Sequence, residues 1–189
     1  PVEVTDATSV TLPPAEVEPV VYKMNVPFSA GKEYFLLENR QQIGFDLGLK
    51  RFGAVHGLAI YHIDETVLYR NFWRPNEAQN WKEFRSEGAK KAWTGETHYG
   101  ISIIQADDRW DLEKAVYIPG LTLPGDLYPG TMGVTRFGND TFPNSSSYYF
   151  WAGSAPKFGY SGVTVENIAE VVGSDVTADL SYQPWKAVK

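Results

Sequence analysis

The amino-acid sequence predicts an all-β protein, an antiparallel, jelly-roll-like β-sandwich with one short helical insertion. Three observations lead to this fold class. The 189 residues include 17 glycines and 12 prolines scattered along the chain, which favours short strands between turns over long helices. Aromatic residues make up 14% of the chain, and they are typical of strands. About nine or ten short segments rich in β-formers are separated by turn residues, as in sandwich domains.

The first 30 residues are predicted to form an extended, proline-rich arm or a set of edge strands. Prolines at positions 13, 14, 19 and 27 exclude a long helix here. The candidate strands are 2–5, 9–12 and 20–26. We expect residues 31–189 to form a single β-sandwich domain, with an insertion at about 69–97.

Alternating side chains predict a strand over 32–41. Residues of opposite parity should lie on opposite faces, with Tyr34, Leu36, Glu38 and Arg40 on one and Phe35, Leu37 and Asn39 on the other. We predict that at least one of Glu38 and Arg40 is partly buried and paired. Residues 44–57 are predicted to be a loop.

The segment 58–64 is apolar on both sides for most of its length and is predicted to be a central strand. Its His62 and Asp64 should share a face with Leu58 and Ile60. The best helical window is 76–84, within the insertion.

Further strands are predicted at 100–106, 148–151, 163–168 and 176–182. The predicted core is built from large apolar residues on the inward faces of the four best strands. These residues are Phe35, Leu37, Leu58, Ile60, Ile101, Ile103, Val163 and Val165.

Composition argues against several functions. The net charge is −6 and the isoelectric point about 5.1, so we expect neither nucleic acid nor an anionic membrane as partner. The chain has no cysteine, which excludes disulfides and cysteine catalysis. No apolar run reaches the roughly 18 residues of a transmembrane helix. Because the chain begins at Pro1 and shows no signal segment, we expect a processed or trimmed product.

The histidines do not form a familiar catalytic motif. There are three of them, His56, His62 and His98, and no His-Glu-x-x-His motif, so no zinc is expected in this chain. No Gly-x-Ser-x-Gly motif marks a nucleophilic serine, although composition alone leaves Ser-His-Asp catalysis open.

Acidic residues at strand ends suggest a calcium site. Oxygen ligands that converge from loops are what calcium requires in proteins. Strands 58–64 and 100–106 are expected to be neighbours, which would place Asp64 near Asp107. The candidate ligands are Asp64, Glu65, Asp107, Asp111 and Asp126. The alternative is that these acids are solvated turn residues that cap backbone N–H groups.

The tryptophans also allow two interpretations. Exposed Trp and Tyr side chains stack on sugar rings or anchor protein interfaces, whereas buried ones fill a core. The tryptophans in or beside the insertion and the acidic turn are Trp73, Trp81, Trp93 and Trp110.

Several ordered blocks of sequence carry a family resemblance. The block 33–42 (EYFLLENRQQ), followed by Gly44-Phe45-Asp46, resembles a signature of the immune inhibitor A-like secreted metallopeptidases. In that family the signature follows the catalytic domain. Later blocks resemble the family in the same order, so that the resemblance covers roughly residues 30–170. These later blocks are 57–65, 98–107, 110–112, 124–130 and 142–145.

The chain also departs from the family pattern. The catalytic His-Glu-x-x-His helix of the family is absent. The family's Ala-Asp-Gly turn is Ala106-Asp107-Asp108 here, and its doubled Gly-Asp loop occurs once, at Gly125-Asp126. The stretch 69–97 is longer than in the family.

The resemblance implies a non-catalytic β-sandwich module, secreted or at the cell surface, from a zinc metallopeptidase. Its expected partner is the catalytic domain of that peptidase, or neighbouring copies of the same chain. Two alternatives remain. The aromatic excess is compatible with a carbohydrate- or surface-binding module, and the proline-rich arm with a structural subunit of a homo-oligomer or extracellular assembly.

Overall fold

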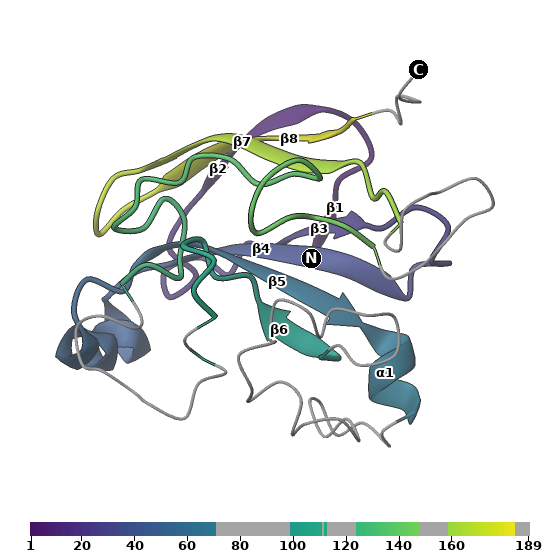
Figure 1. The fold of residues 1–189 in the computed structure, drawn as a ribbon. Helices are drawn as coiled ribbons and strands as arrows, with labels where there is room; N and C mark the ends of the chain where they lie inside the picture. The colour runs from purple at the N-terminus through teal and green to yellow at the C-terminus, as the bar shows by residue number, and fades with distance from the viewer. Residues whose placement is uncertain (71–98, 111, 113–123, 148–158, 184–189) are drawn as a thin grey trace.

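The protein is a sandwich of two β-sheets, seen in a computed structural model that describes residues 1–70, 99–110, 112, 124–147 and 159–183. A five-stranded sheet has the strand order β1-β3-β4-β5-β6, and a three-stranded sheet has the order β2-β8-β7. The smaller sheet lies over the larger one (Figure 1). All pairs of neighbouring strands are antiparallel except β1 and β3. The predicted all-β sandwich is therefore confirmed.

Eight strands and two helical segments are assigned among the described residues. The strands are β1 (Val2–Glu3), β2 (Thr8–Leu12), β3 (Tyr22–Asn25), β4 (Glu33–Arg40), β5 (Gly57–Asp64), β6 (Ile101–Ile103), β7 (Val163–Glu170) and β8 (Val176–Tyr182). The helical segments are the 3-10 helix η1 (Gly44–Phe52) and the short helix α1 (Glu65–Arg70). The predicted helix at 76–84 and strand at 148–151 lie outside the described residues.

The centre of the larger sheet follows the predicted alternation. Along β4, residues of odd number are buried and residues of even number are half-buried. The inward face of β5 carries His62 and Asp64 together with Leu58 and Ile60, as predicted. Counting both faces, seven of the eight residues of β5 are buried. Two buried faces explain why this segment is almost continuously apolar.

The main core lies between the sheets and contains six of the eight predicted core residues. The two exceptions, Ile101 and Ile103, are half-buried. The pairing of β6 with β5 places them opposite Ile63 and Tyr61, on the outer face of the sheet, while Ser102 faces inward beside His62. The predicted face of β6 was wrong by one residue, which exchanges the two faces of a strand.

The outer face of the larger sheet carries a second apolar cluster. Val55, Ala59 and Leu127 are buried there, and Leu49 and Phe52 of η1 pack against them. The segment 44–57 was predicted to be a loop, but most of it is the helix η1. The three-residue spacing of Leu49 and Phe52 puts both side chains on the face of η1 that covers this cluster.

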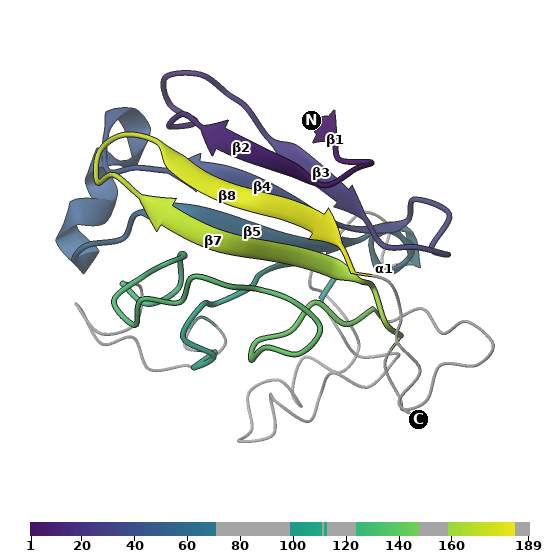
Figure 2. The same cartoon turned by 90° about the horizontal axis from the view of Figure 1, so that it is seen from above.

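The N-terminal residues belong to this sandwich. Strand β2 pairs with β8 along its whole length, and β1 pairs with β3 (Figure 2). The first 30 residues therefore supply an edge strand to each sheet and several side chains to the core. These core side chains are Val4, Val10, Leu12, Met24 and Val26. No helix in the described part of the chain is long and apolar enough to cross a membrane.

Candidate functional site

The predicted calcium ligands Asp64 and Glu65 lie where β5 leads into α1. Asp64 Oδ1 accepts hydrogen bonds from the backbone N–H and the hydroxyl of Thr66, at 2.8 and 2.5 Å, and so caps the start of the helix. Glu65 accepts a hydrogen bond from the Tyr34 hydroxyl at 3.3 Å and lies 3.7 Å from the Lys32 ammonium group. Both carboxylates therefore have local structural roles.

Asp107 and Asp126 lie on loops that meet. The backbone N–H of Ala106 donates to the carbonyl of Asp126 at 2.9 Å, and Asp126 is only 2% exposed. A Cβ added to Gly125 would lie 2.3 Å from Asp107 Oδ2, so the absence of a side chain there allows this close approach. Asp111 lies outside the described residues.

The strand register separates the two pairs of acids. Asp64 N donates to the carbonyl of Gly100, whereas Asp107 lies seven residues further along the same segment. At about 3.3 Å per residue, this places Asp107 roughly 20 Å away, towards the opposite end of β5. The expectation that Asp64 and Asp107 are neighbours was wrong, because antiparallel strands bring opposite ends together. Among the described residues, no three His, Asp or Glu side chains form a group that would hold a metal.

A buried cluster of polar side chains lies on the inward face of β4 and β5. Glu33 Oε1 is 2.8 Å from His62 Nε2, and Ser147 donates to Glu33 Oε2 at 2.7 Å. Each of the three residues is at most 1% exposed, and the His62 ring lies against Phe35 with 5.3 Å between ring centroids. Buried polar groups require such partners, because an unpaired one costs about 1–3 kcal/mol. The arrangement suits internal anchoring better than contact with a substrate.

A second polar network joins the two sheets at the end of the sandwich where β4 finishes. Gln41 Nε2 donates to Glu170 Oε1 at 2.9 Å, and the same oxygen lies 2.6 Å from His56 Nδ1. Gly173 N donates to Gln41 Oε1 at 2.7 Å. The turn between β7 and β8 is thus attached to the segments that flank η1.

Asn39 extends this network into the core. Its Nδ2 donates to the carbonyls of Leu12 and Ser174, each at 2.8 Å. One amide group therefore contacts both the last residue of the edge strand β2 and the turn between β7 and β8. Asn39 is completely buried. Asn39 and Gln41, together with His56 and Glu170, therefore hold the two sheets together at this end.

Arg40, on the outer face of β4, is the centre of a charged cluster. Its guanidinium binds both oxygens of Asp46, which anchors η1, and donates to Glu38 Oε1 at 3.0 Å. The Tyr61 hydroxyl donates to the same Glu38 oxygen at 2.8 Å. The hydrogen bonds to Asp46, and then Glu38, raise the pKa of Arg40, and burial followed by the charge of Glu38 raises the pKa of Tyr61. The predicted partial burial and pairing of Glu38 and Arg40 are confirmed.

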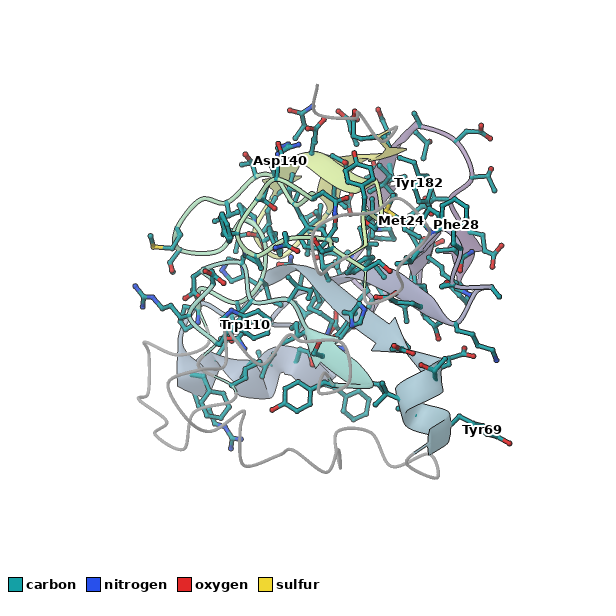
Figure 3. The ribbon with its side chains drawn as sticks, turned by 45° about the vertical axis from the view of Figure 1, so that its right-hand side comes forward. Met24, Phe28, Tyr69, Trp110, Asp140 and Tyr182 are labelled. Carbon is teal, nitrogen blue, oxygen red and sulfur yellow. The ribbon has the colours of Figure 1, made fainter. Side chains whose placement is uncertain are left out.

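The one tryptophan among the described residues is buried. Trp110 is 6% exposed, and its indole N–H donates to Asp108 at 2.7 Å. Exposed aromatic side chains come from other segments, such as Tyr69 of α1, which points away from the sandwich (Figure 3). Trp73, Trp81 and Trp93 lie outside the described residues.

Comparison with known proteins finds no family model and no curated protein that match this chain. The resemblance to immune inhibitor A-like peptidases therefore stays a prediction.

Among the residues described above, sequence reasoning did not single out Glu33, Ser147 or Asp46. The alternation in β4 and β5 was enough to place Glu33 and His62 on inward faces, whereas Ser147 and Asp46 are brought in by loops that carry no periodic signal.

Proposed function

We propose that this chain is a non-catalytic β-sandwich module of an immune inhibitor A-like secreted zinc metallopeptidase, and that it supports and binds the catalytic domain. The observation that carries the proposal concerns the block with the strongest resemblance, residues 33–42. Its polar side chains Glu33, Asn39 and Gln41 are buried in contacts that hold the sandwich together. A signature made of such residues is expected in a rigid support rather than in an active site.

One end of the sandwich supports a binding role. The loop 13–21, η1 and the turn between β7 and β8 all lie at this end (Figure 2). They carry apolar side chains that are each more than half exposed, namely Val17, Phe45, Leu47, Val171 and Val172. Apolar side chains gathered on one part of a surface are typical of interaction sites. We assign this end to contact with the catalytic domain.

The test begins with the reading frame that precedes the codon for Pro1. The proposal expects a His-Glu-x-x-His motif there. The encoded catalytic domain would be produced separately, and its binding to this chain measured by calorimetry. Phe45→Ala should weaken binding at least tenfold, because large buried aromatic side chains dominate interface energies.

The matched control is Phe28→Ala. Phe28 is 73% exposed and lies before β4, whereas Phe45 follows β4 at its other end. This variant should bind like the unaltered chain. Absence of the upstream motif, or proteolysis by the chain alone that a zinc chelator abolishes, would contradict the proposal.

Calcium binding is proposed for the loops of Asp107 and Asp126 alone. Two carboxyl-bearing residues on contacting loops are a partial ligand set of the kind calcium uses, and backbone carbonyls or water would complete it. Asp64 and Glu65, whose carboxylates hold α1 and the neighbouring side chains, are left out.

A further inference from the structure

The charged cluster around Arg40 contains a third carboxylate. Glu16 Oε1 lies 3.7 Å from Arg40 Nε, in addition to the contacts that Arg40 makes with Asp46 and Glu38. The side chain of Glu16 is 10% exposed, as is that of Asp46. Its second oxygen, Oε2, is buried without a hydrogen-bond partner. A buried carboxylate oxygen with no donor is costly, which calls for an explanation.

The backbone around Glu16 holds the side chain in this position. Ala15 N donates to the carbonyl of Asn39 at 2.8 Å, and the N–H groups of Val17 and Glu18 donate to the carbonyl of Pro14 at 2.8 and 3.0 Å. On the other side, a Cβ added to Gly44 would lie 3.3 Å from Glu16 Cβ. Glu16 is therefore enclosed between its own turn and the start of η1.

The charges in the cluster do not balance when all groups have their usual ionisation. Arg40 and Asp46 face Glu16, and Glu38 of β4 and Tyr61 of β5 complete the cluster through Arg40. Tyr61 is neutral and donates to Glu38. Arg40 is the one cation within ion-pair distance of these carboxylates among the described residues, so one positive charge faces three negative ones. Like charges this close favour uptake of a proton by one of the acids.

We propose that Glu16 takes up a proton and donates it in a hydrogen bond to Asp46, which makes the turn at residues 14–18 a pH-dependent latch on η1. Proton uptake satisfies the buried oxygen of Glu16 and leaves Asp46 ionised for its two bonds to Arg40. At low pH the latch is closed. When Glu16 loses the proton, repulsion from Asp46 opens it. The latch is independent of the proposed function.

The pKa directions of the two acids agree with this assignment. Burial, then contact with Asp46, raises the pKa of Glu16 above its ordinary value of 4.5. Burial alone would raise the pKa of Asp46, but hydrogen bonds from Arg40 and Glu16 outweigh it and lower that pKa. Because the folded protein binds the Glu16 proton more tightly than the unfolded chain, the latch contributes fully below pH 4.5 and is lost as pH rises through the raised pKa.

Hydrogen exchange of the Ala15 amide reports whether the latch is closed, because this N–H is bonded to Asn39. If the pKa of Glu16 is raised by one unit, the protection factor of the Ala15 amide should be about tenfold lower at the alkaline limit than at the acidic limit. In Glu16→Gln the new side-chain amide group donates to Asp46 at every pH, so the protection of the Ala15 backbone amide should become independent of pH. Glu18→Gln is the matched control, since Glu18 is exposed and two residues away, and it should behave like the unaltered chain.

Side-chain carbon NMR of the unaltered chain provides a second measurement that needs no variant. The Glu16 carboxyl carbon should titrate above the ordinary glutamate value of 4.5, and the Asp46 carbon should respond at the same pH. A Glu16 that titrates with the ordinary value for glutamate would overturn the proposal. So would a pH-dependent protection of Ala15 that persists in Glu16→Gln.

Discussion

At the scale of single residues, Ser147 shows how a buried acid is anchored. Its hydroxyl donates to Glu33 Oε2, deep between the sheets. Ser147→Ala removes this donor and should lower the free energy of unfolding by about 1–3 kcal/mol, since the carboxylate loses a charge-assisted hydrogen bond. Chemical denaturation of the purified chain measures the change.

The neighbouring Ser146 provides the control. It is only half-buried, and the Asn139 amide donates to its hydroxyl at a long 3.4 Å. Ser146→Ala should change the free energy of unfolding by no more than about 0.5 kcal/mol. Equal losses in the two serine variants would mean that the Glu33 cluster does not contribute specifically to stability.

At the scale of elements, strands with one strong periodicity could be predicted and connections could not. In β4, buried residues alternate with half-buried ones, and the period of two placed Phe35 and Leu37 on the inward face from sequence. In β6 and directly after it, isoleucines occupy positions 101, 103 and 104, so apolar character alone leaves the register undecided. Pairing with β5 resolves it, and Ser102 rather than an isoleucine turns inward.

The segments that connect the strands could not be predicted for a related reason. The helix η1 is held by Asp46, which reaches Arg40, and by Leu49 and Phe52, which cover an apolar cluster on the sheet. These are tertiary contacts, and a nine-residue 3-10 helix has little intrinsic stability of its own. The latch residue Glu16 was likewise hidden, because nothing in a proline-rich turn indicates that an acid will be buried beside Arg40.

The start of β5 yields a prediction about one glycine. Gly57 has a φ of 126°, and a Cβ there would lie 2.3 Å from the carbonyl oxygen of Tyr128. Gly57→Ala should therefore destabilise the protein by at least about 1–3 kcal/mol, from overlap with backbone atoms that pair with Leu58. Thermal unfolding followed by circular dichroism measures this loss.

Gly48, within η1, is the matched control for this substitution. No heavy atom lies within 4 Å of a Cβ added there. Gly48→Ala should be neutral or slightly stabilising, because it reduces the entropy of the unfolded chain. If Gly57→Ala were equally harmless, the close contact between β5 and the loop at Tyr128 would be wrong.

At the scale of the whole molecule, the core between the sheets sets stability. Leu37 is fully buried in it, whereas its neighbour Leu36 lies half-buried on the opposite face of β4. Leu37→Ala should cost about 2–5 kcal/mol in the free energy of unfolding, a large part of the roughly 5–15 kcal/mol of a typical domain. Leu36→Ala should cost clearly less. An unchanged melting temperature in Leu37→Ala would contradict the placement of β4.

Calcium, if it binds as proposed, acts on one end of the molecule only. The loops of Asp107 and Asp126 touch each other, and Asp64 lies at the other end of β5. A ligand that binds only the folded state adds about 2.7 kcal/mol when its free concentration is one hundred times the dissociation constant. The melting temperature of the unaltered chain should therefore rise in millimolar calcium and fall back with a chelator.

Variants separate this site from a general effect of salt. Asp107→Asn should abolish the calcium-dependent rise, since it removes one charged ligand, while magnesium at equal ionic strength should not replace calcium at a site built from flexible loops. Asp64→Asn weakens the cap of α1 but should keep the full calcium response. A rise that survives Asp107→Asn, or that is lost equally in Asp64→Asn, would place the ion elsewhere. No rise at millimolar calcium would leave Asp107 with the capping role of the alternative interpretation, in which it accepts a hydrogen bond from the N–H of Arg109 at 3.0 Å.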